Sequence, residues 1–242
     1  MTESVDRDEV ARFAALAEEW WNPDGPYGPL HRMTPVRVEY VRDRLASRFG
    51  RDRASLRSLK GLELLDVGCG GGILAEPLAR LGAAVTGIEP APESVAVARA
   101  HAAAAGLDIA YRAATAEQLR AEGARFDAVI ASEVVEHVAD PAAFVRTLAD
   151  LARPGGLVLL STLNRTLKSF ALAIVGAEVV LRWIPVGTHD WKKFVTPGEL
   201  EGFCRDAGLD VADVTGMIYD PLRGTWRLGR DASVNYWLAA EK

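Results

Sequence analysis

One short segment constrains the fold of this chain more than any other: LLDVGCGGG, residues 64–72. Its apolar start predicts a buried strand ending at Asp66, and four of the next six residues are glycine. Glycine lets the backbone turn sharply and lets a ligand approach without meeting a Cβ atom. The helix expected behind the turn presents free N–H groups and the positive end of its dipole. The segment therefore predicts a strand–loop–helix unit that holds a ligand at its turn.

A second strand, AVTGIE at residues 84–89, ends in an acidic residue, Glu89. An acid at the tip of the second strand is placed to accept hydrogen bonds from both ribose hydroxyls of a nucleoside. Dinucleotide-binding loops use G-x-G-x-x-G, in which the third glycine lets the helix pack beneath a pyrophosphate. Here Ile73 stands at that position, which disfavours a nicotinamide-dependent oxidoreductase. The G-x-G-x-G pattern that remains resembles the class I S-adenosylmethionine-dependent methyltransferases.

From Glu63 onward, short apolar runs alternate with Ala-rich helical stretches. Unbroken apolar strands alternating with helices imply a parallel sheet covered on both faces. Later strands at residues 209–216 and 233–240 complete the sheet, and the last is expected to return antiparallel. We predict an α/β fold with a Rossmann-like seven-stranded sheet of the class I methyltransferase type. The other expected strands are 63–67, 84–89, 108–112, 126–131 and 157–162, and the helices are 73–82, 91–106 and 141–156.

Two further segments are predicted outside the sheet. Residues 1–60 form a helical N-terminal cap, with helices over 7–19 and from 36 to about 48. Residues 164–193, after the fifth strand, are long for a connection in this architecture, and such excursions are usually functional. We expect cap, insert and sheet to form a single domain over residues 1–242.

Composition narrows the class of protein. The net charge of −5 argues against a nucleic-acid partner, which requires a basic surface. The two cysteines lack metal-type spacing and the N-terminus is polar, so we expect a cytoplasmic protein without a signal peptide. The apolar stretch at residues 169–186 carries Glu178 and Arg182, which disfavours a membrane-spanning helix.

The segment ASEVVEH, residues 131–137, holds two glutamates and a histidine. If the chain is helical from Ser132, then Glu133, Glu136 and His137 stand at i, i+3 and i+4 and share one face. A phenol has a pKa near ~10, so a methyl acceptor of this kind must first lose its proton. A general base, worth roughly 10²–10⁴-fold, or a divalent metal can remove it. Spacing alone favours residues that shape the pocket over a Mg²⁺ site.

Several segments together resemble the O-methyltransferases of ubiquinone biosynthesis. The most specific are WWNPDGPYGPLHRMTPVR at residues 20–37 and GTHDWKKFVTPGEL at 187–200, and the similarity covers nearly the whole chain. That family methylates hydroxyls of a 2-polyprenyl-6-hydroxyphenol and of a 3-demethylubiquinol. The resemblance implies an S-adenosylmethionine-dependent enzyme acting on a polyprenylated phenol or quinol. Another small phenolic acceptor, or a non-catalytic lipid adaptor that binds S-adenosylmethionine, remains an alternative.

The resemblance also implies where the cofactor binds. Arg37 is expected to pair with the methionine carboxylate of the cofactor, unless it forms a surface salt bridge instead. Glu89 replaces the aspartate expected at the ribose position. Ser132 stands where some relatives carry methionine, so its contact is expected through the main chain. The full predicted cofactor-binding set is Arg37, Asp66, Gly68, Gly70, Glu89 and Ser132.

For the chemistry, the resemblance favours Mg²⁺ at Glu133, Glu136 and His137. The predicted catalytic residues are Glu133, His137 and His189, the last beside Asp190 in a loop expected above the cofactor.

The insert and the tryptophan pair each have two interpretations. The insert is apolar, with cations near its ends, which suits docking on the inner face of an anionic membrane next to a polyprenylated substrate. A lid or a dimer contact is the alternative. Trp20 and Trp21 are expected either to anchor a substrate or to pack the cap. The cations of the insert are Arg165, Lys168, Arg182, Lys192 and Lys193.

Overall fold

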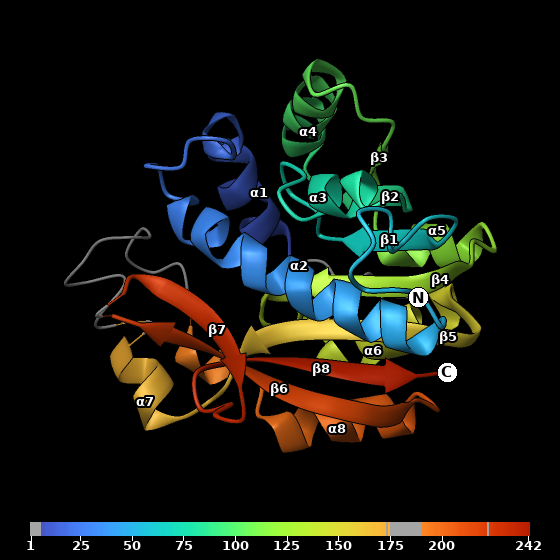
Figure 1. The fold of residues 1–242 in the computed structure, drawn as a ribbon. Coiled ribbons are helices and arrows are strands. Elements are labelled where there is room, and N and C mark those ends of the chain that lie inside the picture. The colour runs from blue at the N-terminus through green and yellow to red at the C-terminus, as the bar shows by residue number, and fades with distance from the viewer. Residues whose placement is uncertain (1–5, 173, 175–189, 222) are drawn as a thin grey trace.

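A mixed β-sheet with helices on both faces forms the centre of the computed structural model, which describes residues 6–172, 174, 190–221 and 223–242 (Figure 1). Its strand order is β3-β2-β1-β4-β5-β8-β6-β7. Strands β1 to β5 pair in parallel, whereas β8 runs antiparallel to both β5 and β6. The strands are β1 Glu63–Val67, β2 Ala84–Glu89, β3 Ala110–Ala113, β4 Phe126–Ser132, β5 Ala152–Leu163, β6 Asp210–Asp220, β7 Thr225–Gly229 and β8 Asn235–Glu241.

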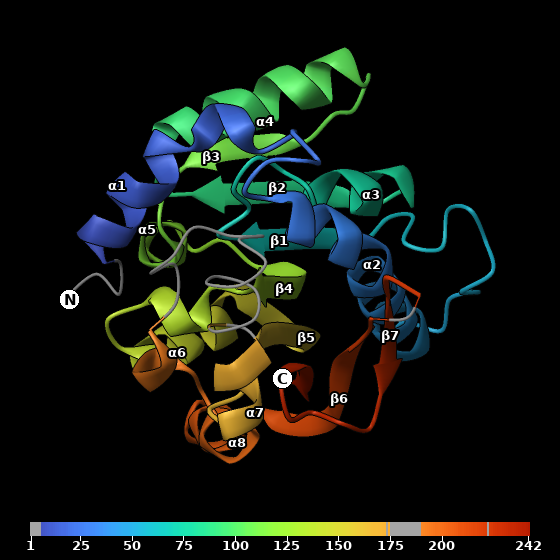
Figure 2. The same cartoon turned by 90° about the vertical axis from the view of Figure 1, so that its left-hand side faces the viewer.

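Helices cover both faces of the sheet (Figures 1 and 2), and neighbouring residues of a strand pack into opposite faces. Leu64 packs into the cluster that holds α2, α3 and α4, while Leu65 packs into the cluster that holds α5, α6 and α8. This alternation follows from the period of two along a strand. The helices are α1 Arg7–Ala15, α2 Gly28–Arg48, α3 Ala75–Arg80, α4 Pro92–Ala104, α5 Ala116–Ala121, α6 Pro141–Leu151, α7 Leu167–Ser169 and α8 Pro197–Asp206.

The predicted fold class is confirmed, and the structure corrects several boundaries. All seven expected strands are present, and β7 adds an eighth at the edge, paired with β6 from Gly216↔Gly229. The helix expected over 141–156 ends at Leu151, because Pro154 and the two glycines after it favour the extended start of β5. Helix α2 begins at Gly28 rather than at residue 36 and continues through Pro35, which the sequence suggested as a boundary.

The tryptophan pair packs the cap onto the glycine loop. Trp20 Nε1 donates to Ser94 Oγ of α4 at 3.0 Å, and Trp21 Nε1 donates to the Gly71 carbonyl at 2.9 Å. A Cβ atom at Gly70 or at Gly71 would lie only 2.4 Å from Trp20. These two glycines therefore make room for the indole ring of Trp20.

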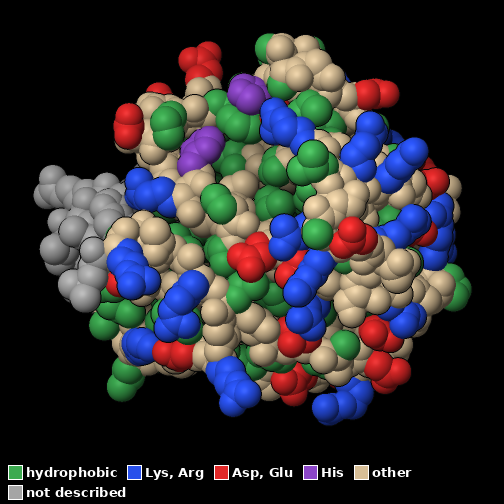
Figure 3. Space-filling view, in the orientation of Figure 1, with side chains coloured by type: hydrophobic (Ala, Val, Ile, Leu, Met, Phe, Trp, Pro, Cys, Tyr) green, Lys and Arg blue, Asp and Glu red, His purple; other side chains and the backbone are tan. Residues whose placement is uncertain are grey.

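Much of the predicted insert, including His189 and Arg182, lies outside the described residues. In the part that the structure describes, no helix is long and apolar enough to span a membrane. Acidic and basic side chains are interspersed over the face seen in Figure 3.

The packing at Gly70 generates a test. Gly70 has φ +51 and its Cβ would overlap the Trp20 ring, whereas Gly106 has φ +67 and faces open space in the described structure. Both alanine variants should lose about 1–2 kcal/mol through the left-handed backbone. Gly70→Ala should lose roughly 1–3 kcal/mol more through overpacking. Chemical unfolding followed by tryptophan fluorescence measures the difference, and equal losses in the two variants would contradict this packing.

Candidate functional site

A cavity of about 610 Å³ opens beside the carboxyl ends of β1, β2 and β4. The cap covers one side of it through Trp20 and Tyr27, and the glycine loop and Glu89 line the same region. The cavity is also lined by apolar side chains from α2 and the β6–β7 hairpin. Those side chains are Leu30, Met33, Met217, Ile218 and Trp226. The cavity can therefore hold a polar ligand at the loop and an apolar one beside it.

Glu89 connects the second strand to the glycine loop. Its Oε2 accepts a hydrogen bond from the Gly70 backbone N–H at 3.3 Å, and its Oε1 accepts from the Ala91 N–H at 3.1 Å. Burial raises the pKa of Glu89, although these two N–H groups oppose the shift. The longer side chain of glutamate thus reaches back to the loop while its carboxylate lines the cavity.

Arg37 and Asp66 lie buried in the wall of the cavity. This location excludes the surface salt bridge considered for Arg37. Burial lowers the pKa of the Arg37 guanidinium, while the charges of Glu133, Asp66 and Glu136 oppose that shift. Arg37 Nε and Nη2 and Asp66 Oδ2 have no hydrogen-bond partner among the described residues. The site therefore holds a buried cation and a buried acid with unused hydrogen-bonding capacity, which suits a zwitterionic ligand.

Gly68 and Ser132 also line the cavity, as the sequence predicts for cofactor contacts. Gly68 has φ +68, and a Cβ there would lie 2.6 Å from Val134 Cγ2. Ser132 Oγ lies 2.8 Å from Ser161 Oγ of β5, so its hydroxyl is engaged with a neighbouring strand. The side chain of Ser132 is thus held by β5, which is compatible with the predicted cofactor contact through its main chain.

The helix expected to begin at Ser132 does not form. Glu133 takes φ +58, a left-handed conformation that breaks the path from β4, and the next regular turn is the 3₁₀ segment Val135–His137. The predicted shared face of Glu133, Glu136 and His137 is therefore wrong.

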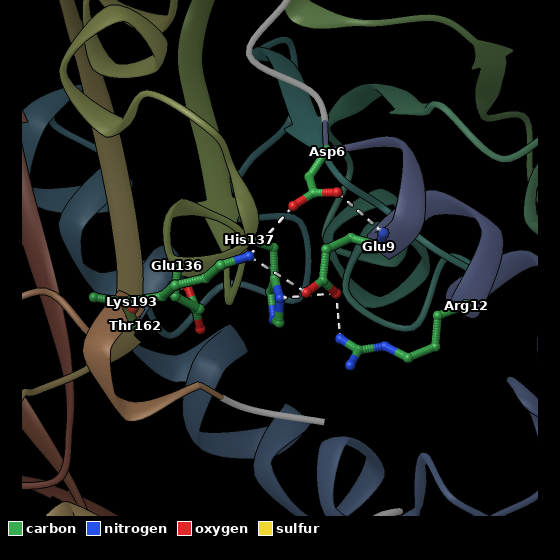
Figure 4. A network of polar contacts seen from close by, with 7 residues as sticks. All are labelled: Asp6, Glu9, Arg12, Glu136, His137, Thr162 and Lys193. Atoms are coloured by element: carbon green, nitrogen blue, oxygen red, sulfur yellow. Dashed lines mark hydrogen bonds and ion pairs between the residues drawn. The ribbon is translucent and has the colours of Figure 1, made fainter. Parts of the chain in front are cut away.

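The three side chains instead contact different partners, and Figure 4 shows those of Glu136 and His137. Glu133 Oε1 accepts from Ser161 Oγ at 3.0 Å, and Glu136 Oε2 accepts from Thr162 Oγ1 at 2.9 Å. His137 Nδ1 lies 3.3 Å from Glu9 Oε2 of α1. Across the described residues, no three His, Cys, Asp or Glu side chains are grouped closely enough to hold a metal. In this arrangement the three residues do not fit the magnesium site implied by the resemblance.

A polar network joins α1 to this region (Figure 4). Glu9 pairs with Arg12, with His137 and with Lys193, and Lys193 Nζ also lies 3.3 Å from Asp6 Oδ2. The hydrogen bond from His137 contributes most to lowering the pKa of Glu9. Sequence reasoning missed this network and the pocket-lining Tyr27, because both depend on contacts between segments distant in the chain.

Comparison with known proteins identifies the family. A family profile described as "Methyltransferase domain" matches residues 38–214. The Ubiquinone biosynthesis O-methyltransferase of Methylobacterium nodulans is 58% identical over 239 residues, covering 99% of this chain and 96% of the relative. That of Azorhizobium caulinodans is 54% identical over 98% of this chain and 94% of the relative. The chain belongs to the ubiquinone biosynthesis O-methyltransferases.

A solved structure supports the fold of this ubiquinone biosynthesis O-methyltransferase. Magnesium protoporphyrin IX methyltransferase from Synechocystis, with bound SAM, superposes with a TM-score of 0.64 at 20% identity and covers 100% of both chains. The chain is thus an S-adenosylmethionine-dependent O-methyltransferase, and the resemblance found in its sequence is confirmed. Family membership also decides against the oxidoreductase and the non-catalytic adaptor.

The buried acid at the end of β1 predicts a pH effect in the cofactor-free enzyme. Burial raises the pKa of Asp66 from its ordinary value near 3.8 to about 7. Between these values the folded chain keeps a proton that the unfolded chain has lost, so the free energy of unfolding falls as pH rises. Asp66→Asn cannot titrate, and we expect thermal unfolding between pH about 5 and about 8 to show a weaker pH dependence than in the wild type.

Glu122→Gln is the control for this experiment. Arg112 lowers the pKa of the exposed Glu122 carboxyl. Glu122 therefore changes the free energy of unfolding only below this pH window, and its replacement should leave the slope within the window unchanged. An Asp66→Asn variant with the same slope as the wild type would contradict the assignment.

Proposed function

We propose that the cavity binds S-adenosylmethionine at the glycine loop and presents its methyl group to a phenolic hydroxyl of a polyprenylated ubiquinone precursor. The acceptors are a 2-polyprenyl-6-hydroxyphenol and a 3-demethylubiquinol. The observation that carries this proposal is that one cavity is lined both by Glu89 and the glycine loop and by apolar side chains of α2 and the β6–β7 hairpin. A charged nucleoside and a lipid-like phenol require those two environments side by side.

The donor is proposed to bind through three charged side chains. The Glu89 carboxylate accepts hydrogen bonds from the ribose hydroxyls. The buried Arg37 guanidinium binds the methionine carboxylate with the N–H groups that lack partners in the described structure. The Asp66 carboxylate accepts from the methionine ammonium group. Gly68 and the main chain of Ser132 complete the contact surface, and Gly70 contributes through the N–H that donates to Glu89 Oε2.

Glu133 is proposed as the general base. Its carboxylate lines the cavity, is positioned by Ser161, and lies 3.9 Å from Arg37 Nη2. The phenolic O–H gives its proton to Glu133 as the oxygen attacks the methyl carbon. The C–O bond forms, the S–CH₃ bond breaks, and S-adenosylhomocysteine leaves. His137 lines the same cavity and is the second candidate. Magnesium stays a prediction of the family resemblance, and no step here depends on it.

Methyl transfer from labelled S-adenosylmethionine tests the proposal, with a short-chain demethylubiquinol compared with a simple catechol. Preference for the prenylated acceptor supports it, whereas equal or greater activity on the catechol favours the alternative of another small phenolic acceptor. Parallel assays with EDTA and with added Mg²⁺ test the magnesium expectation.

The base assignment predicts that Glu133→Gln lowers kcat roughly 10²–10⁴-fold with little change in S-adenosylmethionine affinity. A nitro-substituted catechol ionises more readily and needs the base less, so the variant should lose much less activity on that acceptor. His137→Gln, assayed with the same two acceptors, tests whether His137 is the general base instead. The account is wrong if Glu133→Gln keeps wild-type kcat, or if His137→Gln shows this pattern in its place.

We also propose that the start of the insert touches the inner face of the membrane in which the acceptor resides. Leu167, Phe170 and Leu172 are 81%, 42% and 54% exposed, which is unusual for large apolar side chains so close in sequence. Arg165 and Lys168 stand beside them, paired with Glu199 and Asp231. Apolar side chains with adjacent cations suit an interfacial contact.

The double variant Leu167→Ser/Leu172→Ser should therefore bind less to vesicles of anionic phospholipid in a co-sedimentation assay. Leu56→Ser is the matched control, since Leu56 is 87% exposed but lies between α2 and β1. Each leucine that inserts into the membrane contributes about 1.5–3 kcal/mol, so losing both should weaken binding at least tenfold. Equal binding of the double variant, the control and the wild type would contradict the membrane contact.

A further inference from the structure

The hydroxyl of Tyr27 is a buried polar group that the fold does not use. The Tyr27 side chain is buried, and its ring stacks on Trp20 with centroids 3.7 Å apart and planes 6° from parallel. Its Oη has no hydrogen-bond partner among the residues that the structure describes. Leaving a buried hydroxyl unpaired costs free energy that phenylalanine would avoid at the same position. The packing of the cap explains the ring of Tyr27 but leaves its oxygen unexplained.

The location of Tyr27 suggests what the oxygen is for. Tyr27 and Glu89 both line the cavity. Tyr27 stacks on Trp20, which packs against Gly70. Because the Gly70 N–H donates to Glu89 Oε2, Tyr27 and Glu89 lie on the same side of the cavity. Burial raises the pKa of the Tyr27 hydroxyl, and the negative charge of Glu89 raises it further, so the two groups lie within electrostatic reach. The hydroxyl therefore belongs to the ribose end of the cavity.

The position of the Tyr27 ring is fixed on two sides. Tyr27 directly precedes α2 as its N-cap residue. On the other side, its stacking partner Trp20 is anchored by Ser94 and fills the space next to Gly70 and Gly71. A hydrogen-bond donor held this way is pre-organised before any ligand arrives, which limits the entropy lost on binding.

The two groups have complementary chemistry toward a ribose. An ionised carboxylate only accepts hydrogen bonds, so Glu89 can use the two O–H groups of a ribose diol but cannot satisfy the lone pairs of its oxygens. A phenolic hydroxyl supplies the missing donor. We propose that Tyr27 is a further cofactor-binding residue, whose Oη donates a hydrogen bond to a ribose hydroxyl oxygen of S-adenosylmethionine held by Glu89. This inference rests on the donor site described under the proposed function.

The chain offers a matched control in Tyr111. Its Oη is likewise buried and without a hydrogen-bond partner in the described structure. Tyr111 packs against Gly72 and Gly87 and is not among the described residues that line the cavity. Tyr111→Phe therefore removes the same atom from a buried position outside the lining of the cavity.

Calorimetry with S-adenosylhomocysteine tests the inference on the full chain. Tyr27→Phe should bind it about three- to tenfold more weakly than the wild type, the range of one lost hydrogen bond, and Tyr111→Phe should bind it unchanged. Without ligand, the unfolding midpoint of Tyr27→Phe should equal or exceed that of the wild type, because an unpaired polar atom has been removed. A lower midpoint would show that the hydroxyl serves the fold, which would overturn the inference.

Two further ligands locate the hydrogen bond. The 2′-deoxy and 3′-deoxy analogues of S-adenosylhomocysteine each lack one ribose oxygen. For one of them, the three- to tenfold difference between wild type and Tyr27→Phe should disappear, while Tyr111→Phe should follow the wild type throughout. Unchanged affinity of Tyr27→Phe, or an equal loss for all three ligands, would overturn the inference. Failure of the wild type to bind S-adenosylmethionine would instead remove the donor site itself.

Discussion

The indole of Trp20 occupies the space beside Gly70 and Gly71 that any other residue would fill with a side chain. This contact joins the N-terminal cap to the glycine loop, and the rest of the donor site depends on it. With the cap in place, Tyr27 closes one side of the cavity and α2 carries Arg37 into its wall. The glycine loop thus serves two purposes, since Gly68 lines the cavity and the missing Cβ atoms of Gly70 and Gly71 admit the residue that covers it.

The second constraint is electrostatic. Arg37, Asp66 and Glu89 are all buried, and each has a pKa displaced first by burial. The opposite charges of Arg37 and Asp66 counter each other's shift, whereas the charge of Glu89 raises the pKa of Asp66 further. Arg37 and Asp66 also keep polar atoms without hydrogen-bond partners in the described structure. Buried groups of this kind destabilise a protein unless a ligand satisfies them. Such an arrangement fits a site built for a ligand that carries both a carboxylate and an ammonium group.

Local sequence patterns predicted most of the sheet and the position of the cofactor loop, because period-two strands and a glycine turn are encoded by neighbouring residues. They failed where distant contacts decide the structure. The helical reading of Glu133 to His137 was wrong because Glu133 turns left-handed where β4 ends and takes Ser161 of the next strand as its partner. Strand β7 was missed because it forms only by pairing with β6. No local signal distinguished Tyr27 from any other aromatic residue near a turn, since its role depends on Trp20 and Glu89.

A crystal structure of the enzyme with S-adenosylhomocysteine tests the central claim most directly. The account predicts ribose hydroxyls on the Glu89 carboxylate, the homocysteine carboxylate on Arg37, and Trp20 still seated beside Gly70 and Gly71. A nucleoside bound elsewhere in the cavity, or a cap displaced from the glycine loop when the ligand is present, would contradict it.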